Sequence, residues 1–402
     1  MSSTVENTRS RGQLLHGDSA AVSDSWCVNP CFESLACVWT ALTAIGFFIN
    51  YGAKLHLPTT RIQYRLVQAI PLIPVGMAFM ASFFLPETPR YLASKQRHDE
   101  GRQVLARLRG KTADDPDIEE EFGIIDAQLR EKTADLSSVT HWQAFKETQA
   151  NANYRQRFWL LMTMQTVAQW TGGNGITYYI SDIFEYAGVS DSSSLISSGA
   201  YGIVKWVFTL AFTWGLIDYI GRRRCTMMGL SLQLAAHIYM GAYMGLQPES
   251  EANKNASNAA VASVFIYAVG WSIGLCTMPF VYGTEIFPTR IRNISVAIGT
   301  SLHWLFQFAV VRATPNMFVS MQVWGAYLFW GIICFLGLII LGIWMPETKG
   351  VPIERMGDLF DSPWYLRWNA KARPLDSPSF ASDSHDTGVE ISNEKTDKQE
   401  TR

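Results

Sequence analysis

The chain has 402 residues, a formal net charge of −2 and 48% hydrophobic residues, yet its mean hydropathy is only +0.05. This near-neutral balance gives no support for nucleic-acid binding. The low mean arises because long uncharged stretches alternate with strongly polar ones, so the distribution along the chain is more informative than the average. The six cysteines, among them Cys27 and Cys31, lack zinc-site spacing, and no nucleophile–base set or metal constellation predicts an enzyme.

Eight apolar segments are candidates for membrane-spanning helices. A bilayer core about 30 Å thick requires roughly 20 apolar residues in a helix, and only a helix satisfies the backbone of an isolated segment there. The segments are 35–53, 66–85, 157–180, 195–217, 225–246, 258–284, 293–311 and 321–345. The sequence therefore predicts an all-α membrane protein, with two spans in 35–85 and six in 157–346.

The remaining segments are polar and are predicted to lie in the cytosol. Residues 1–34 contain no apolar core long enough for a signal peptide. Residues 86–156 are predicted to form a helical linker, because Leu105 and Leu108 have helical spacing and Gly110 is a stop signal. Residues 347–402 form a tail, whose Ser, Asp, Lys and Glu content predicts disorder from about residue 373.

Basic residues in the loops favour an orientation with both termini in the cytosol. The triplet Arg222, Arg223 and Arg224 then lies inside, and the short loop 182–194 outside has no basic residue. The first outer loop, with three basic residues, is an exception. Asn255 begins a glycosylation sequon that would face outside in this orientation.

Three charged clusters lie at predicted cytosolic ends of spans, and each pairs an acid with a base a few residues later. They are Glu87 with Arg90, Asp218 with Arg222 and Arg223, and Glu285 with Arg290 and Arg292. Each cluster alone is explained equally well by solvated charges that anchor a helix end. Together they predict a salt-bridge latch between helix bundles, because losing one partner of a buried pair costs about 3–5 kcal/mol. Such a set could hold one conformation until substrate binds.

The clusters belong to motifs that resemble the signatures of the sugar porter family in the major facilitator superfamily. In chain order, the motifs are Pro86-Glu87-Thr88-Pro89-Arg90, Gln169 with Gly172-Gly173-Asn174 and Tyr178-Tyr179, Asp218-Tyr219-Ile220-Gly221-Arg222-Arg223, Glu285-Ile286-Phe287-Pro288-Thr289-Arg290-Ile291-Arg292 and Pro346-Glu347-Thr348-Lys349-Gly350. The resemblance covers 35–360, and the runs 281–285 and 303–308 are most similar to fungal quinate permeases.

The resemblance implies a secondary transporter of the plasma membrane that moves a polyol, a hydroxy-acid such as quinate, or a sugar by alternating access. It implies no cofactor, leaves proton coupling open and indicates no oligomeric state. The eight spans resemble helices five to twelve of a twelve-helix fold, so we expect a partial bundle that lacks the first four helices and is inactive if they are essential. The alternatives are a non-transporting membrane sensor or regulator, and a defunct fragment.

Several polar and aromatic residues match the family's substrate-binding positions. They are Gln165, Gln169, Asn174, Tyr178, Tyr179, Phe280, His303, Trp304 and Gln307. For the amides the alternative is hydrogen bonding between helices. For the tyrosines it is a place in the interfacial aromatic belt, and for His303 and Phe280 it is ordinary packing.

Lys205 lies near the middle of the segment 195–217. A cation at the bilayer centre costs at least about 2.5–3.5 kcal/mol on insertion scales, and such residues usually face a cavity or the protein interior. Lys205 would complement a substrate carboxylate, as in quinate. The alternatives are snorkelling to the interface and pairing with an acid elsewhere in the fold.

Overall fold

The computed structural model describes residues 38–367, apart from 39, 57–60, 113, 137–140, 190, 247–253, 352–354, 362, 364 and 366. Every regular element in these ranges is helical, as predicted. The predicted polar segment 1–34 and the predicted disorder from residue 373 lie outside the described residues.

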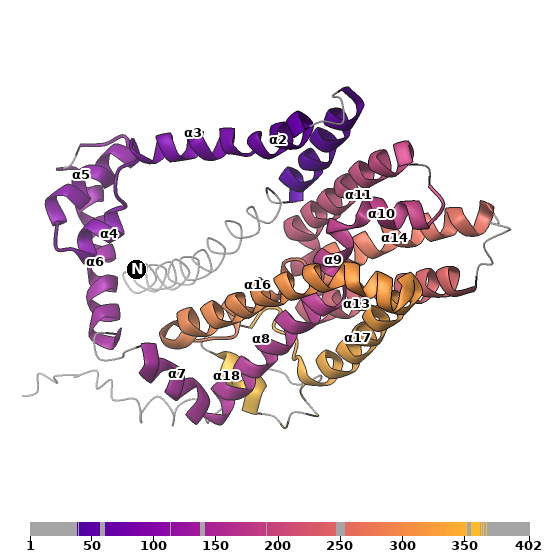
Figure 1. Ribbon diagram of the computed structural model, residues 1–402. Helices are drawn as coiled ribbons and strands as arrows, with labels where there is room; N and C mark the ends of the chain where they lie inside the picture. The colour runs from indigo at the N-terminus through magenta and orange to yellow at the C-terminus, as the bar shows by residue number, and fades with distance from the viewer. Residues whose placement is uncertain are drawn as a thin grey trace, which may run out of the picture.

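The C-terminal part is a bundle of long helices that pack side by side (Figure 1). Its elements are α8 Ala152–Trp170, α9 Gly173–Tyr178, α10 Ile180–Tyr186, α11 Asp191–Ala211, the π-helix η1 Phe212–Leu216, α12 Ile217–Ile220, α13 Arg222–Leu246, α14 Lys254–Gly274, α15 Met278–Glu285, α16 Thr289–Ser320 and α17 Gln322–Trp344. Helix α13 lies against α14 and α17, and α8 lies against α16 and α17. Gly229 of α13 faces Gly270 and Gly274 of α14. Small residues at a helix crossing let the backbones approach closely, as is common between membrane helices.

The N-terminal part begins with a helix over 40–56, which packs on the bundle. Ala44 and Phe48 of this helix occupy the space beside Gly202 and Gly199 of α11. Helices α2 Arg61–Ala69 and α3 Leu72–Ser82 follow, and neither buries a residue. Their apolar side chains are therefore free to face lipid, where exposure carries no hydrophobic cost.

A small helical layer follows α3 in the chain and stands apart from the bundle in Figure 1. It consists of α4 Pro89–Ser94, α5 His98–Arg109 and α6 Pro116–Leu136. Leu105, Ile118 and Phe122 are among the residues of its own core. Helix α5 ends at Gly110, which has a φ of 67° in the left-handed region. The predicted helix stop is therefore confirmed.

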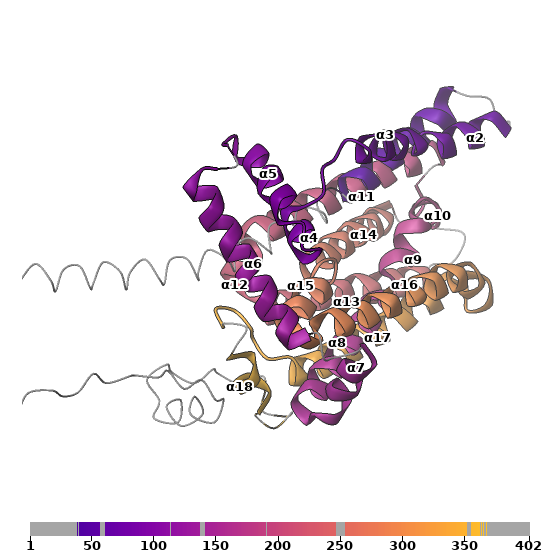
Figure 2. The ribbon, with the colours of Figure 1, turned by 90° about the vertical axis from the view of Figure 1, so that its left-hand side faces the viewer.

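Helices α7 His141–Ala150 and α18 Met356–Asp361 lie together at the N-terminal end of α8 (Figures 1 and 2). Asn153 Nδ2 donates a hydrogen bond to Asp361 Oδ1 at 2.8 Å. The Arg157 guanidinium stacks over the Phe360 ring, 5.0 Å from its centre. These contacts fix the segment after the last long helix to the start of α8.

Five helical stretches in the described residues are long and apolar enough to cross a membrane. They are Arg61–Ser82, Ser193–Ile220, Lys254–Glu285, Arg290–Ser320 and Gln322–Trp344. Where the structure describes them, the other predicted spans are also mainly helical, but α8 and α13 carry more polar side chains. Four predicted spans are not continuous α-helix: 66–85 has a turn at 70–71, 157–180 is interrupted at 171–172, 195–217 contains the π-helix η1, and 258–284 is broken at 275–277. The span predicted at 293–311 is too short, because α16 continues through Pro315 to Ser320.

Candidate functional site

The site is organised around a break between α8 and α9. Gly172 has a φ of 88°, which is accessible to glycine but strained for other residues, and it ends the α8 hydrogen-bond ladder. A Cβ added at Gly173 would overlap the Trp271 ring, and one at Gly172 would lie 3.0 Å from the Trp330 ring. The glycines therefore allow both a turn in the backbone and close contact with two indole rings.

Four polar side chains from α8, α9 and α16 form a continuous hydrogen-bonded chain beside this break. Asn174 Nδ2 donates to Gln169 Oε1 at 2.9 Å. Gln169 Nε2 lies 2.6 Å from His303 Nε2, and His303 Nδ1 lies 2.7 Å from Gln165 Oε1. The pattern is consistent when neutral His303 carries its hydrogen on Nδ1, so that it donates to Gln165 and accepts from Gln169. We call these four residues the amide–imidazole chain.

The structure thus brings together four of the predicted substrate residues from α8, α9 and α16. The Phe280 ring of α15 lies against them, with its centre 5.0 Å from that of His303. Trp304 is 50% exposed, and its ring meets His303 edge-on. Gln307 is half-buried one turn further along α16.

The two predicted tyrosines differ from each other in burial. Tyr178 is 63% exposed at the end of α9. Tyr179 is half-buried, and its hydroxyl donates to the carbonyl oxygen of Val311 at 3.5 Å. Tyr179 therefore joins the α9–α10 junction to α16, whereas Tyr178 points away from the packed core.

Lys205 is buried, 7% exposed, near the middle of the Ser193–Ile220 stretch. Its Nζ donates to Thr177 Oγ1 of α9 at 3.2 Å and lies 5.6 Å from the centre of the Trp271 ring. Among the described residues, no ion pair includes Lys205. Burial argues against snorkelling, and the ammonium group has a hydroxyl and a π face as neighbours.

A cluster of charged side chains surrounds Arg222, which begins α13 just after the end of α12. Its Nη2 is 2.9 Å from Glu285 Oε1, and its Nη1 is 2.7 Å from Asp218 Oδ1. The Arg222 and Glu285 side chains are 8% and 14% exposed, whereas Asp218 is 53% exposed. Burial disfavours the charge of Arg222, but Glu285 and then Asp218 outweigh this effect and raise the pKa of Arg222.

Two residues that the sequence analysis did not assign to the latch also belong to this cluster. Glu347 Oε1 accepts from the Arg222 backbone N–H at 2.8 Å, at the start of α13. The Thr348 hydroxyl donates to Glu285 Oε2 at 3.1 Å. The signal was present in the sequence, since an acid lies two residues after the end of the last predicted span.

Of the predicted latch residues, Asp218, Arg222 and Glu285 form one ion-paired set in the part of the chain that the structure describes. Glu87 and Arg90 are exposed at the start of α4, in the separate helical layer. Arg223 donates to the Gly342 carbonyl oxygen, and Arg292 to that of Phe287. Arg290 pairs with Glu147 of α7 at 3.3 Å. Local motif spacing placed acids beside bases, but tertiary packing gives these residues other partners.

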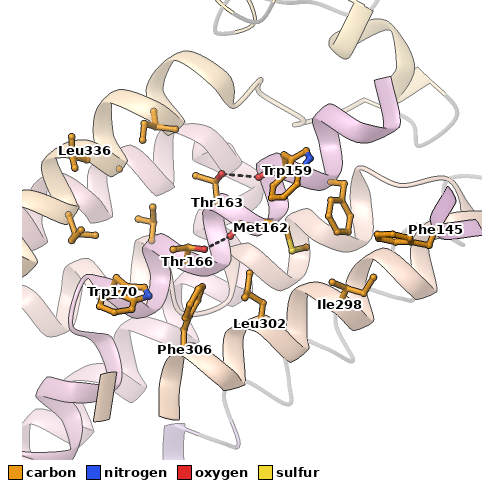
Figure 3. A pocket seen from close by; sticks show the side chains of 15 residues that line it. Phe145, Trp159, Met162, Thr163, Thr166, Trp170, Ile298, Leu302, Phe306 and Leu336 are labelled. Atoms are coloured by element: carbon orange, nitrogen blue, oxygen red, sulfur yellow. Dashed lines mark hydrogen bonds between the residues drawn. The ribbon is translucent and has the colours of Figure 1, made fainter. Parts of the chain in front are cut away.

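An apolar groove of about 790 Å³ lies along α8, between α16 and α17 (Figure 3). Trp170, Leu302 and Phe306 contribute to its wall. Its two threonine hydroxyls, of Thr163 and Thr166, bond to carbonyl oxygens of their own helix. The groove therefore presents an apolar wall, whereas the polar groups lie in the amide–imidazole chain.

The described residues contain no group of three or more His, Cys, Asp or Glu side chains that could hold a metal ion. Asn255 is exposed in the first turn of α14, where its side chain is accessible.

Residues 33–360 match the family described as "Sugar (and other) transporter". The chain is 30% identical over 380 residues to a probable quinate permease of Aspergillus niger, covering 90% of this chain and 69% of that protein. It is 29% identical to a probable quinate permease of Aspergillus fumigatus (89% and 67% covered) and 30% identical to the quinate permease of Neurospora africana (80% and 61%). The chain thus spans about three fifths to two thirds of the length of these relatives.

Solved structures show the same fold at lower sequence similarity. The proton:xylose symporter XylE bound to 6-bromo-6-deoxy-D-glucose matches with a TM-score of 0.61 at 19% identity, over 82% of this chain and 66% of that chain. A partially occluded, inward-open form of the Escherichia coli xylose transporter XylE matches with a TM-score of 0.60 at 18% identity (79% and 63%). The relatives and the structures are permeases and transporters, in agreement with the sequence analysis, which predicts no enzyme.

Proposed function

Because the chain belongs to the sugar (and other) transporter family of the major facilitator superfamily, a family of multi-pass membrane transporters, we propose that it moves a small hydroxylated carboxylic acid such as quinate across the membrane. The observation that carries this proposal is that the amide–imidazole chain and buried Lys205 both reach helix α9, through Asn174 and Thr177. The likeness to quinate permeases, at about 30% identity, is the second support.

The amide–imidazole chain supplies the partners for hydroxyl groups. Amide side chains offer both donors and acceptors, and a hydroxyl group needs both. His303 fixes the polarity of the chain, because its Nδ1–H uses the oxygen of Gln165 and leaves that amide nitrogen free to donate. The Gln165 amide nitrogen on α8 is then available as a donor to an oxygen of a polyol or hydroxy-acid.

Lys205 supplies the partner for the carboxylate. It is bonded to Thr177, which lies three residues after Asn174 on α9. The two binding elements therefore meet on one short helix, at the distance of a single turn. A carboxylate would neutralise a cation that is otherwise costly at this depth, so the anionic substrate gains an interaction that a neutral sugar lacks.

The Arg222 cluster supports transport by alternating access. It joins the start of α13 to the end of α15 and to the segment after α17. Helices that are held together at one end and able to separate elsewhere allow the site to open to one side at a time. We propose that this end is cytosolic, since Arg222, Arg223 and Arg224 are concentrated there, and that exposed Asn255 lies at the outer end.

Uptake of labelled quinate into cells that express the chain tests the proposal. Uptake above that of mock-transfected cells, and competition by unlabelled quinate but not by its uncharged amide, is expected. Measuring uptake with and without an imposed pH gradient decides whether protons drive it. A ligand-dependent transcriptional or growth response without any uptake would contradict the proposal and indicate a sensor instead.

A further inference from the structure

Two side chains from α13 and α14 contact the backbone of the segment between α8 and α9. His237 Nε2 of α13 donates to the carbonyl oxygen of Thr171 at 3.1 Å, and the hydroxyl of Tyr267 of α14 donates to the same oxygen at 3.3 Å. Both side chains are buried, 1% and 2% exposed, and their ring centres are 5.0 Å apart. Two donors from two helices therefore converge on one carbonyl oxygen.

The Thr171 carbonyl needs these donors because the helix is interrupted there. Gly172 is left-handed, and the first backbone bond of α9 runs from Ile176 N–H to the Gly172 oxygen at 2.8 Å. Carbonyl groups at a helix end have no partner within the helix, and an unsatisfied carbonyl is costly where water is excluded. His237 and Tyr267 thus stabilise the interrupted backbone over a continuous helix.

The residues that we propose to bind substrate flank the same break. Gln169 lies two residues before Thr171 and Asn174 three residues after it, and the bond from Asn174 Nδ2 to Gln169 Oε1 crosses the break at 2.9 Å. The angle of the chain at Thr171 and Gly172 therefore determines whether these two amides meet. A change of that angle would separate them without altering either side chain.

We propose that His237 and Tyr267 are positioning residues, which hold the Thr171 carbonyl and thereby fix the angle that brings Asn174 to Gln169. They do not touch substrate themselves. Their effect on substrate affinity rests on the transport function proposed above, but their effect on the backbone at the break does not.

The same buried cluster contains a matched control. The Tyr327 hydroxyl of α17 is buried and has no hydrogen-bond partner among the described residues. Its ring lies 5.7 Å from that of His237. Tyr327→Phe therefore removes the same atom as Tyr267→Phe from the same surroundings, without removing a bond to Thr171.

Hydrogen–deuterium exchange of the full chain in lipid nanodiscs tests the positioning role without requiring transport. We expect Tyr267→Phe and His237→Phe each to accelerate exchange in peptides covering 171–176. The expected factor is about fivefold, which corresponds to a net hydrogen-bond contribution of about 1 kcal/mol. Tyr327→Phe should exchange at the wild-type rate. Wild-type exchange in both test variants, or equal acceleration in the control, overturns the proposal.

The second measurement is the concentration dependence of quinate uptake. Tyr267→Phe should raise KM measurably, by up to about fivefold, while Tyr327→Phe leaves KM unchanged. Because each substitution removes a single hydroxyl group, a rise in KM is not explained by misfolding. Faster exchange together with an unchanged KM overturns the link to Asn174. Absence of uptake by the wild type overturns the proposed function, while faster exchange at 171–176 still supports the role of His237 and Tyr267.

Discussion

Arg222 Nη2 lies 2.9 Å from Glu285 Oε1, although the two residues are 63 positions apart in the chain. Both side chains are largely buried, and each has a further partner: Asp218 for Arg222, and Thr348 for Glu285. A buried charge that loses its partner is strongly destabilising, whereas an exposed pair contributes little. The two acids around Arg222 should therefore differ in importance.

We predict that Glu285→Gln lowers the free energy of unfolding by roughly 3 kcal/mol, the lower end of the cost of breaking a buried pair, because Asp218 remains. Asp218→Asn is the control and should cost less than about 1 kcal/mol, since Asp218 is 53% exposed. Denaturant unfolding of the purified protein in mild detergent, followed by tryptophan fluorescence, measures both. Equal losses for the two variants would show that Glu285 has no special place in the cluster.

The amide–imidazole chain gives a second prediction. His303→Leu removes the group that joins Gln165 to Gln169, and leaves two buried polar groups without a partner. Each such group costs about 1–3 kcal/mol, so the KM for quinate should rise about tenfold or more.

Gln233→Leu is the control for that substitution. Gln233 of α13 is equally buried, and neither atom of its amide group has a hydrogen-bond partner among the described residues. Its loss should leave KM at the wild-type value and the protein at least as stable. If both leucine variants weaken uptake alike, buried polarity in general, and not this chain, governs affinity.

Packing at the break gives a third prediction. Gly173→Ala places a methyl group in the space of the Trp271 ring, and overpacking of this kind costs about 1–3 kcal/mol. Gly215→Ala is the control, because no atom lies within 4 Å of a Cβ at that position. Thermal unfolding in detergent should show a lower midpoint for the first variant only. A wild-type midpoint for Gly173→Ala would mean that the indole ring moves aside freely.

Features that depend on neighbouring residues could be predicted from the sequence. Apolar length predicted the long helices of the C-terminal bundle, and Gly110 predicted the end of α5, because both depend on neighbouring residues. The break at 275–277 was missed, since its residues are as apolar as the spans that flank it. Hydropathy alone carries no record of such a turn.

Long-range partners followed a different rule. Gln169 and His303 are 134 residues apart, and only the shared family positions suggested that they meet. Glu87 and Arg90 match a family motif equally well, yet they lie in a layer with its own core. Motif spacing identifies polar residues at helix ends, but the packing of helices decides which of them pair.

The final prediction concerns Lys205 and the charge of the substrate. Lys205→Met keeps an unbranched side chain of similar length beside Thr177 and Trp271 but removes the charge. We expect the KM for quinate to rise about tenfold to a hundredfold, the range for a lost hydrogen bond to a charged group. Lys205→Arg keeps the cation and should lose much less.

A neutral polyol of similar size separates the charge of Lys205 from its packing. Lys205→Met should leave inhibition of uptake by that polyol unchanged, because the polyol makes no ion pair. The thermal unfolding midpoint of Lys205→Met should be no lower than that of the wild type, because the variant has no uncompensated buried cation at this position. If acid and polyol lose affinity by the same factor, Lys205 acts through its contacts with Thr177 and Trp271, and the carboxylate assignment is wrong.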